Sequence, residues 1–383
     1  MRRSAALRAP GAPLRRVAMP LLAALAALGF AACSSGPGDV VDGSDLAEVA
    51  ARRGFDPAAV RHPFLLDDEM REWLAGNVSS RQSVERRLDD LLAALVSAED
   101  GRRIRYGGGH TGSAREVFES GRSNCLGLTG LFVAMARELG VPAFFVWVDE
   151  VESYAEAEDL VVVSNHVTAG FGPLHTLRIL ELGREPSEAG YRSFHRISDL
   201  RAIALYYSNR GAELLQAGDA DAGRRSLETS VAIDGELPSA WVNLGVARRR
   251  GGDPAGAEAA YRRALELDPG QVSAYQNLAT LMRVRGDRDE AAELLTTIPK
   301  LGSRNPYSYL HLGDWAMTRG DYERASRWYR KALRLQRDAP QPRAALGALA
   351  LATGDRAAAE RWLARARRLD PDDPRVRALA AKL

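Results

Sequence analysis

A repeat of 34 residues in the second half of the chain most strongly constrains how the protein can fold. A small residue recurs five times at this spacing, at Gly211, Gly245, Ala279, Gly313 and Gly347. A Gly-Asp pair follows each small residue with the same period, at Gly218-Asp219, Gly252-Asp253, Gly286-Asp287, Gly320-Asp321 and Gly354-Asp355. A fixed period of about 20 to 50 residues is typical of stacked repeat units. The sequence therefore predicts a solenoid in which each unit packs against its neighbours.

Two antiparallel helices are expected in each unit. The small residue would let the first helix approach the second closely, and the glycine of the Gly-Asp pair would end the first helix in a left-handed conformation. The aspartate would then cap the second helix. Proline opens three units, where its missing N–H costs little, at Pro238, Pro306 and Pro340. Residues 374–383 are expected to add a polar capping helix, which solenoids need.

This pattern resembles the tetratricopeptide repeat, and the second unit carries it most completely, in Trp241, Leu244, Gly245, Ala257, Tyr261, Ala264 and Pro269. We therefore interpret residues 201–373 as five such repeats in an all-α solenoid. The resemblance implies a concave groove that binds a protein or peptide. Asn243 and Asn277, on the first helices of units two and three, are the candidate partner-binding residues. A purely structural spacer is the alternative.

The first 32 residues have the composition of an export signal. Five arginines precede an apolar stretch from Val17 to Ala32, which at 16 residues is shorter than the ~20 that a membrane-spanning helix needs. The segment Phe30-Ala31-Ala32-Cys33 resembles the lipobox of bacterial lipoproteins. The resemblance implies a lipidated Cys33, a tether as far as residue 54, and a membrane-anchored protein that faces the periplasm. Since Ser34 rather than Asp follows Cys33, the outer membrane is preferred, and an ordinary signal peptide is the alternative.

Charge and cysteine content limit the partners and the chemistry. The net charge is +2, but residues 1–32 contribute five arginines and no acidic residue, so the remainder is net acidic. Without a clustered basic face, no nucleic-acid partner is expected. Lipidation of Cys33 would leave Cys125 as an unpaired thiol in an exported protein, which is a candidate reactive group. No Cys–His metal spacing occurs, and no metal or other cofactor is expected.

Residues 55–200 predict an α+β domain, because helical patterns come first and β-rich runs follow. Helical patterns cover residues 67–76, 79–99 and 124–139, and a capping box from Ser113 to Glu116 opens a further short helix. The β-rich runs cover residues 143–148, 160–168 and 174–182. Gly172-Pro173 between the last two runs suggests a hairpin.

Cys125 stands at the start of the predicted helix 124–139. Free N–H groups and the helix dipole at this end favour a thiolate over a thiol. Asn124 can cap the helix and is a candidate for positioning the thiol or for holding an oxyanion. Because cysteine is among the most buried residue types, a packing role for Cys125 is the alternative.

A cysteine nucleophile also needs a base, and His166 on the second β-rich run is the candidate. If the hairpin loop covers residues 171–174, His166 pairs with Ile179 and Glu181 lies opposite Ser164. Glu181 would then share a face with His166 and lie close enough to orient the imidazole. Two other histidines compete with His166 as the base, namely His110 and His175.

The stretch Ala114–Gly140, which contains Ser123-Asn124-Cys125-Leu126-Gly127, resembles the nucleophile helix of the transglutaminase-like superfamily. These domains share the papain-like arrangement of a Cys at a helix start with a His and an Asp on successive strands. The resemblance implies that Cys125 is the nucleophile, His166 the base and Glu181 the orienting acid. Glu181 replaces the Asp that is usual in the family, and two aspartates are fallbacks for this role, Asp159 and Asp199.

The same resemblance implies a reaction at an amide or peptide bond through a thioester. Transfer of the acyl group to water gives hydrolysis, and transfer to an amine gives a crosslink. Hydrolysis is favoured because water is always present, and peptidoglycan is one substrate class to test. A non-catalytic scaffold, in which the transglutaminase-like domain only binds, is the alternative.

The segment from Gly107 to Gly112 satisfies the G-x-G-x-x-G pattern of dinucleotide sites. That pattern needs a preceding strand, a following helix and a parallel sheet to bind a dinucleotide. No parallel-sheet pattern follows here, so we interpret the segment as a loop near the cleft.

Overall fold

The computed structural model describes residues 41, 43–54, 60–97, 102–107, 110–157, 160–172, 178–180 and 193–383. The predicted export signal and Cys33 lie outside the described residues, as do Glu181, Asp159 and His175. In the part of the chain that is described, no helix is long and apolar enough to cross a membrane.

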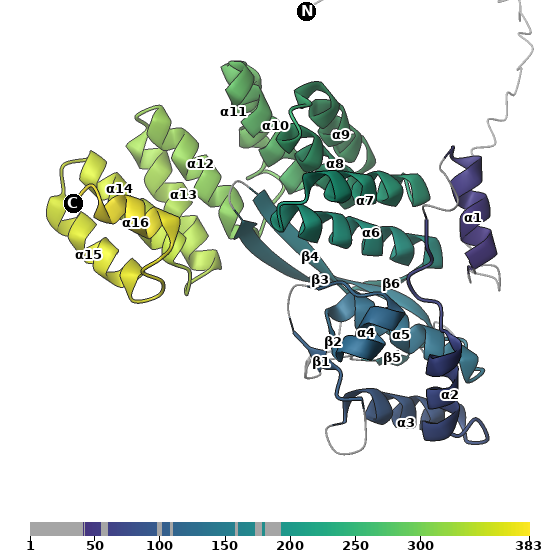
Figure 1. The fold of residues 1–383 in the computed structure, drawn as a ribbon. Coiled ribbons are helices and arrows are strands. Elements are labelled where there is room, and N and C mark those ends of the chain that lie inside the picture. The colour runs from purple at the N-terminus through teal and green to yellow at the C-terminus, as the bar shows by residue number, and fades with distance from the viewer. Residues whose placement is uncertain are drawn as a thin grey trace, which may run out of the picture. The chain divides into compact units, whose positions relative to one another are not determined.

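The first half of the described chain combines short helices with β-strands (Figure 1). Its first three helices are α1 (Gly43–Arg52), α2 (Asp68–Asn77) and α3 (Val84–Val96). Asp67 caps α2 and Ser83 caps α3, because each side chain accepts a hydrogen bond from a backbone N–H of the first turn. Since Ser83 is the cap, α3 begins later than the predicted helix 79–99.

The next four elements are β1 (Arg105–Tyr106), α4 (Ala114–Ser120), β2 (Arg122–Ser123) and α5 (Cys125–Glu138). β1 and β2 pair in parallel. The predicted capping box is confirmed, because Ser113 and Glu116 each accept a hydrogen bond from the other's backbone N–H. Ten of the 14 residues of α5 are buried, so this helix lies within the core.

Four antiparallel strands form a sheet in the order β5-β4-β3-β6. Their bounds are β3 (Phe144–Ala157), β4 (Leu160–Phe171), β5 (Arg178–Leu180) and β6 (Phe194–Ile197). β6 has no counterpart among the predicted runs. β3 extends past its predicted end at Val148, because residues 152–157 also pair with β4.

The predicted pairing of His166 with Ile179 is wrong, because Ile179 pairs with Gly170. β4 continues through Phe171, whose side chain is buried, and Gly172 then takes a left-handed φ of 92°. The connection to β5 therefore begins after Phe171 and is longer than expected. This shifts the partner of Ile179 by four residues along β4.

From Asp199 onward the chain forms helix pairs. The pairs are α6 (Asp199–Gln216) with α7 (Ala220–Ile233), α8 (Pro238–Arg250) with α9 (Pro254–Leu267), α10 (Val272–Arg285) with α11 (Arg288–Thr297), α12 (Pro306–Thr318) with α13 (Tyr322–Leu335), and α14 (Pro340–Ala352) with α15 (Arg356–Arg367). The last helix, α16 (Pro374–Ala380), packs on α14 and α15. The long β3 strand contacts α12.

The predicted helix ends in this array are confirmed. The glycines of the five Gly-Asp pairs all have left-handed φ values, between 72° and 101°. In four pairs the aspartate side chain caps the next helix. Asp287 is the exception, because its carboxylate pairs with Arg285 instead.

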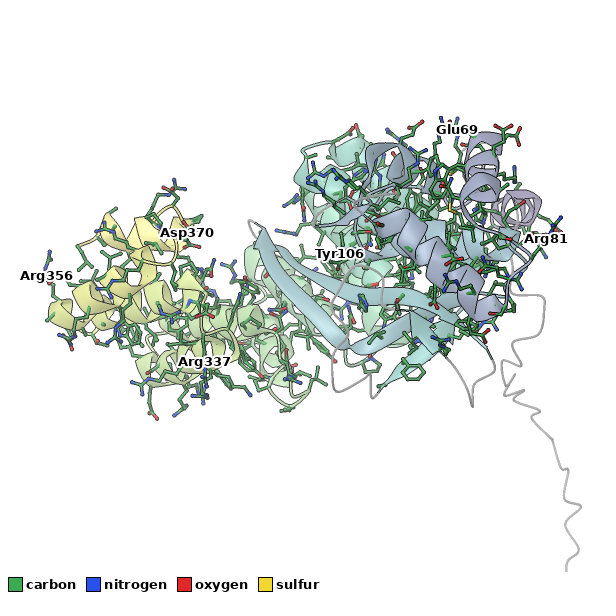
Figure 2. All side chains as sticks on the ribbon, turned by 90° about the horizontal axis from the view of Figure 1, so that it is seen from below. Glu69, Arg81, Tyr106, Arg337, Arg356 and Asp370 are labelled. Atoms are coloured by element: carbon green, nitrogen blue, oxygen red, sulfur yellow. The ribbon has the colours of Figure 1, made fainter. Side chains whose placement is uncertain are left out.

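Small residues permit the close helix packing that was expected. A Cβ at Gly313 would lie 2.2 Å from the ring of Tyr329, and a Cβ at Gly245 would lie 2.5 Å from the ring of Tyr261. Each glycine therefore leaves room for an aromatic ring of the second helix. Charged side chains, Arg356 among them, point outward from the repeat helices (Figure 2).

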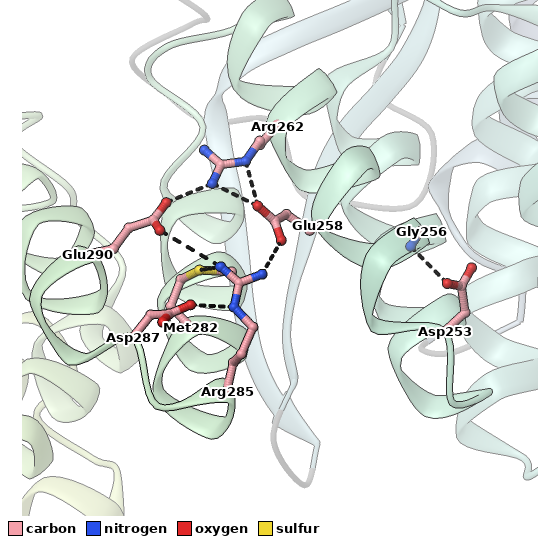
Figure 3. A network of polar contacts seen from close by, with 8 residues as sticks. All are labelled: Asp253, Gly256, Glu258, Arg262, Met282, Arg285, Asp287 and Glu290. Atoms are coloured by element: carbon pink, nitrogen blue, oxygen red, sulfur yellow. Dashed lines mark hydrogen bonds and ion pairs between the residues drawn. The ribbon is translucent and has the colours of Figure 1, made fainter.

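Ion pairs join the second and third repeats (Figure 3). Arg262 of α9 pairs with Glu290 of α11 at 2.7 Å, and Arg285 of α10 pairs with Glu258 of α9 at 2.7 Å. These side chains are 21–51% exposed, so water screens the pairs. Each pair is therefore expected to contribute less than about 1 kcal/mol to stability.

Candidate functional site

Cys125 is the first residue of α5 and is partly buried. Asn124 caps this helix, because its side-chain oxygen accepts a hydrogen bond from the N–H of Gly127 at 3.0 Å. The backbone N–H of Asn124 donates in turn to the carbonyl oxygen of His110 at 3.1 Å. The positive end of the helix dipole therefore lies at the thiol, and Asn124 holds the first turn in place.

His166 of β4 is 4% exposed and forms a hydrogen bond with the Cys125 thiol. Its partner in the neighbouring strand is Val148 of β3, and the register of β3 and β4 shifts between Val148 and Glu152. Such irregularities redirect side chains and are common beside active sites. The structure thus brings together the predicted nucleophile and the predicted base.

The surroundings of Cys125 lower its pKa. Burial raises the pKa of the thiol, but hydrogen bonds with His166 and with the backbone of Val167 and Leu126 lower it. Electrostatic attraction to His166 acts in the same direction, and the resulting pKa of Cys125 lies below the usual value of 9.0. Because the thiolate is the nucleophilic form, this pair suits nucleophilic catalysis.

Close contacts fix α5 against the elements around the site. Thr129, one turn after Cys125, donates a hydrogen bond from Oγ1 to the carbonyl oxygen of Val167 at 3.1 Å. The helix with the thiol and the strand with the imidazole are therefore tied directly. A Cβ at Gly127 would lie 2.8 Å from the carbonyl oxygen of Gly112, so the end of the glycine-rich segment packs against α5 near the site.

Two candidates for the orienting acid, Glu181 and Asp159, lie outside the described residues. The other fallback, Asp199, is ruled out by its position. Its carboxylate accepts hydrogen bonds from Arg137 at 2.6 and 2.9 Å. Arg137 lies twelve residues after Cys125 on the same helix, about 18 Å away along the axis at ~1.5 Å per residue.

The competing histidine that the structure describes, His110, has other partners. Its Nδ1 lies 3.1 Å from Nη1 of Arg210 and 3.6 Å from Oε2 of Glu213. His166 is the imidazole that contacts Cys125. Within the described ranges, no group of three or more His, Cys, Asp or Glu side chains is placed to hold a metal ion.

A hollow of about 950 Å³ opens on the repeat array between α10 and α16. Gln276 lines it and is 6% exposed, and its amide has no hydrogen-bond partner among the described residues. Trp315 adds an apolar surface, with the guanidinium of Arg319 5.3 Å from its ring. Arginines outnumber acids in the lining, which contains Arg283, Arg288, Arg319, Arg375, Asp314 and Asp373.

The two asparagines suggested for partner binding do not line this hollow. Asn243 donates a hydrogen bond to the hydroxyl of Ser208 at 3.0 Å, and Asn277 is 7% exposed. The neighbouring Gln276 lines the hollow instead. Sequence reasoning missed these lining residues because they come from five different helices and share no local pattern.

Comparison with protein families assigns both parts of the chain. Residues 74–170 match the transglutaminase-like superfamily, and this range includes Cys125 and His166. Residues 209–272, 248–310 and 316–383 match tetratricopeptide repeats. The protein therefore carries a transglutaminase-like domain followed by a tetratricopeptide-repeat solenoid, and the predicted fold class and domain order are confirmed.

Several solved structures resemble part of the chain. A tetratricopeptide-repeat protein from Thermus thermophilus is 22% identical with a TM-score of 0.41, over 47% of this chain and 97% of that chain. The protein pilF from Pseudomonas aeruginosa is 16% identical with a TM-score of 0.39, over 48% of this chain and 87% of that chain. MamA from Desulfovibrio magneticus RS-1 is 18% identical with a TM-score of 0.36, over 45% and 97%. No curated protein matches the sequence significantly.

Proposed function

We propose that the protein is a cysteine hydrolase of amide or peptide bonds, with Cys125 as the nucleophile and His166 as the base. The observation that carries this proposal is the thiol–imidazole hydrogen bond at the start of α5, where the surroundings lower the thiol pKa despite burial. The family match over residues 74–170 also supports it. Glu181 is assigned as the orienting acid from its place in the sequence.

The reaction begins when the Cys125 thiolate attacks the carbonyl carbon of the substrate amide. The carbonyl oxygen takes up the electron pair and is stabilised by backbone N–H groups at the start of α5. His166 gives its proton to the leaving nitrogen as the C–N bond breaks, which leaves a thioester. His166 then takes a proton from water, the hydroxide attacks the thioester carbonyl, and the acid leaves as the thiolate returns. An amine in place of water would give a crosslink through the same steps.

The pairing is tested by alkylating Cys125 with iodoacetamide across a range of pH, in the full chain with Cys33→Ser. His166→Ala should raise the apparent pKa of the thiol and slow its alkylation at neutral pH, since it removes the imidazole that stabilises the thiolate. His195→Ala is the matched control, because His195 is exposed on β6 and stacks on Trp147. Slow alkylation that neither substitution changes would contradict the hydrolase and favour the non-catalytic scaffold.

The repeats indicate binding of a protein or peptide. We propose that the hollow takes an extended acidic segment of such a partner. Arg375 is already paired with Asp314, by hydrogen bonds of 2.8 and 3.0 Å, whereas Arg283 and Arg319 add positive charge to the lining. The buried amide of Gln276 can hydrogen-bond the backbone of an extended chain.

Binding of a fluorescent oligoglutamate peptide, compared with an oligoglutamine peptide of equal length, tests this assignment by fluorescence anisotropy. Arg283→Glu should weaken binding of the acidic peptide, because it places like charge in the lining. Arg361→Glu, on the exposed face of α15 and outside the hollow, is the control. Equal binding of the two peptides would contradict an acidic ligand.

We also propose that the protein is held at a membrane of the cell envelope by lipid on Cys33, with the domains facing the periplasm. The lipobox-like segment from Phe30 to Cys33 supports this. Metabolic labelling with a clickable fatty acid in a bacterial host tests it. The full chain should carry label and Cys33→Ser should not, whereas label on neither protein would contradict the anchor.

A further inference from the structure

A chain of hydrogen bonds runs from the first repeat helix to the cap of the nucleophile helix. Oε1 of Glu213, on α6, accepts hydrogen bonds from both the N–H and Oγ1 of Thr111, each at 2.7 Å. Oγ1 of Thr111 accepts in turn from the side-chain amide of Asn124 at 2.6 Å. The Asn124 oxygen accepts from the N–H of Gly127 at 3.0 Å. Glu213 is thus connected to the first turn of α5, where Cys125 lies.

The order of donors and acceptors in this chain is fixed. The hydroxyl of Thr111 has one proton, which it uses to donate a hydrogen bond to Glu213. Its lone pairs therefore remain to accept a hydrogen bond from Asn124. Asn124 must then present its amide N–H₂ to Thr111 and its oxygen to the helix. Thr111 is completely buried, so no water competes for its hydroxyl. Glu213 therefore determines which way the Asn124 amide is turned, and with it whether the cap of α5 forms.

The same repeat helix also holds the far end of α5. Asp199, the first residue of α6, binds Arg137 in the last turn of α5 through hydrogen bonds of 2.6 and 2.9 Å. Glu213 reaches the beginning of α5 from the other end of α6. The two helices therefore run antiparallel, and contacts from α6 hold both ends of the helix that carries Cys125.

α6 belongs equally to the repeat array. It packs against α7, where Ser226 and Ser230 donate hydrogen bonds to carbonyl oxygens of α6 at 2.8 and 2.7 Å. Asn243 of the second repeat donates to Ser208 of α6 at 3.0 Å. A change in how the first two repeats pack would therefore act on the helix that carries Glu213.

We propose that Glu213 is a positioning residue for the Cys125 thiolate. It acts through Thr111 and Asn124, so that the repeat array supplies part of the support for the site in the transglutaminase-like domain. This inference rests on the proposed function of Cys125. Loss of the Glu213 acceptor lets the Asn124 amide turn, weakens the cap of α5 and removes the alignment of the N–H groups that stabilise the thiolate.

Glu213 can affect the thiol in two ways, through its negative charge and through the hydrogen bonds that it accepts from Thr111, and the test must distinguish them. Removing the carboxylate charge would by itself lower the thiol pKa, which opposes the expected effect. Two cationic or titratable groups face the same carboxylate, since Nη1 of Arg210 lies 3.3 Å and Nδ1 of His110 lies 3.6 Å from Oε2. Glu213→Gln removes the charge but keeps an acceptor oxygen, whereas Glu213→Ala removes both. Comparison of these two variants isolates the acceptor.

The test measures the rate of Cys125 alkylation by iodoacetamide against pH, together with the melting temperature, in the full chain with Cys33→Ser. Glu213→Ala should raise the apparent thiol pKa above that of Glu213→Gln and slow alkylation at neutral pH roughly fivefold, the size expected for loss of a helix cap. Thr111→Val should behave like Glu213→Ala, and Thr111→Ser, which keeps the hydroxyl, should restore the parent profile. This second pair decides the question if Glu213→Ala does not fold.

Tyr207→Phe is the control for a merely structural contact of α6. The Tyr207 hydroxyl exchanges hydrogen bonds with the N–H and the carbonyl oxygen of Arg61 at 2.8 and 2.7 Å, away from the Asn124 cap. It should lower the melting temperature and leave the thiol profile unchanged. If the Glu213 and Thr111 variants do the same while His166→Ala still raises the thiol pKa, the positioning role is overturned and the proposed hydrolase stands. If the parent thiol itself has an ordinary pKa that His166→Ala does not change, both proposals are overturned.

Discussion

The transglutaminase-like domain and the repeat array obtain their structures in different ways. In the array, helix ends and close contacts follow from the same few residues in every unit, such as the left-handed glycine of each Gly-Asp pair. The contacts that support the site in the transglutaminase-like domain differ from one another, and two of them join residues far apart in the chain. The Thr111–Glu213 contact spans 102 positions, and the Arg137–Asp199 contact spans 62.

This difference predicts where each region is vulnerable. A contact that recurs in every unit is one of several that stabilise the array, whereas a buried polar contact that occurs once has no equivalent elsewhere in the molecule. Stability of a solenoid is approximately a sum over units and their interfaces. A single substitution in the array should therefore lower its stability according to how much packing is lost in that unit. A substitution in the transglutaminase-like domain should lower stability according to which buried polar groups lose their partner.

The largest effect is expected at the buried ion pair between α5 and α6. Arg137→Met removes the partner of Asp199, whose side chain is only 5% exposed, and should lower the free energy of unfolding by about 3–5 kcal/mol. Glu48→Gln, which breaks an ion pair with Arg52 that is 66% exposed on both sides, should change it by less than about 1 kcal/mol. Urea unfolding measures both. Equal changes in the free energy of unfolding for the two variants would contradict a special contribution of the buried ion pair to stability.

A smaller effect is expected from overpacking one repeat. Gly313→Val places side-chain atoms where the ring of Tyr329 lies, and should destabilise the protein by about 1–3 kcal/mol. Gly251→Ala, at the end of α8, meets only ordinary contacts of 3.4 and 3.5 Å and should be nearly neutral. Thermal unfolding followed by circular dichroism compares the two. A neutral Gly313→Val would contradict the close packing of α12 against α13.

The smallest effect is expected at the exposed ion pairs of the second and third repeats. Hydrogen bonds from Arg262 and Arg285 lower the pKa of Glu258 from its usual 4.5, although partial burial opposes them. The charged form is therefore favoured in the folded state, so this contribution is present above pH 4.5 and is lost as the pH falls through the lowered pKa.

Glu258→Gln should consequently lower the free energy of unfolding at neutral pH by less than about 1 kcal/mol. The difference in unfolding free energy between parent and variant should become smaller below pH 4.5. Urea unfolding at the two pH values measures this. A gap between parent and variant that stays constant with pH would show that the carboxylate is not held in its charged form.

The sequence predicts the array almost residue by residue, because its rules are local and repeated. It also predicts α5 and the capping box at Ser113, which depend on neighbouring residues. The sequence does not predict the register of β4 and β5. β4 continues through Phe171, whose side chain is buried, so the connection to β5 begins later than the sequence suggests. The role of Glu213 leaves no local signal, since it depends on tertiary contacts between α6 and residues about a hundred positions earlier.

The family resemblance supplied what local patterns could not. Cys125 and His166 are 41 positions apart, and no periodicity connects them. The structure places the two side chains in contact, whereas the third member of the proposed site, Glu181, lies outside the described residues and stays a prediction.

The proposed reaction depends on a thiolate–imidazolium pair formed by Cys125 and His166. The most direct measurement is a titration of the thiolate by its ultraviolet absorbance, in the full chain with Cys33→Ser, so that Cys125 is the sole cysteine. We expect a thiol pKa below 9.0 that rises when His166 is replaced by Ala. A thiol that titrates at 9.0 or above, and does so equally without His166, would contradict it.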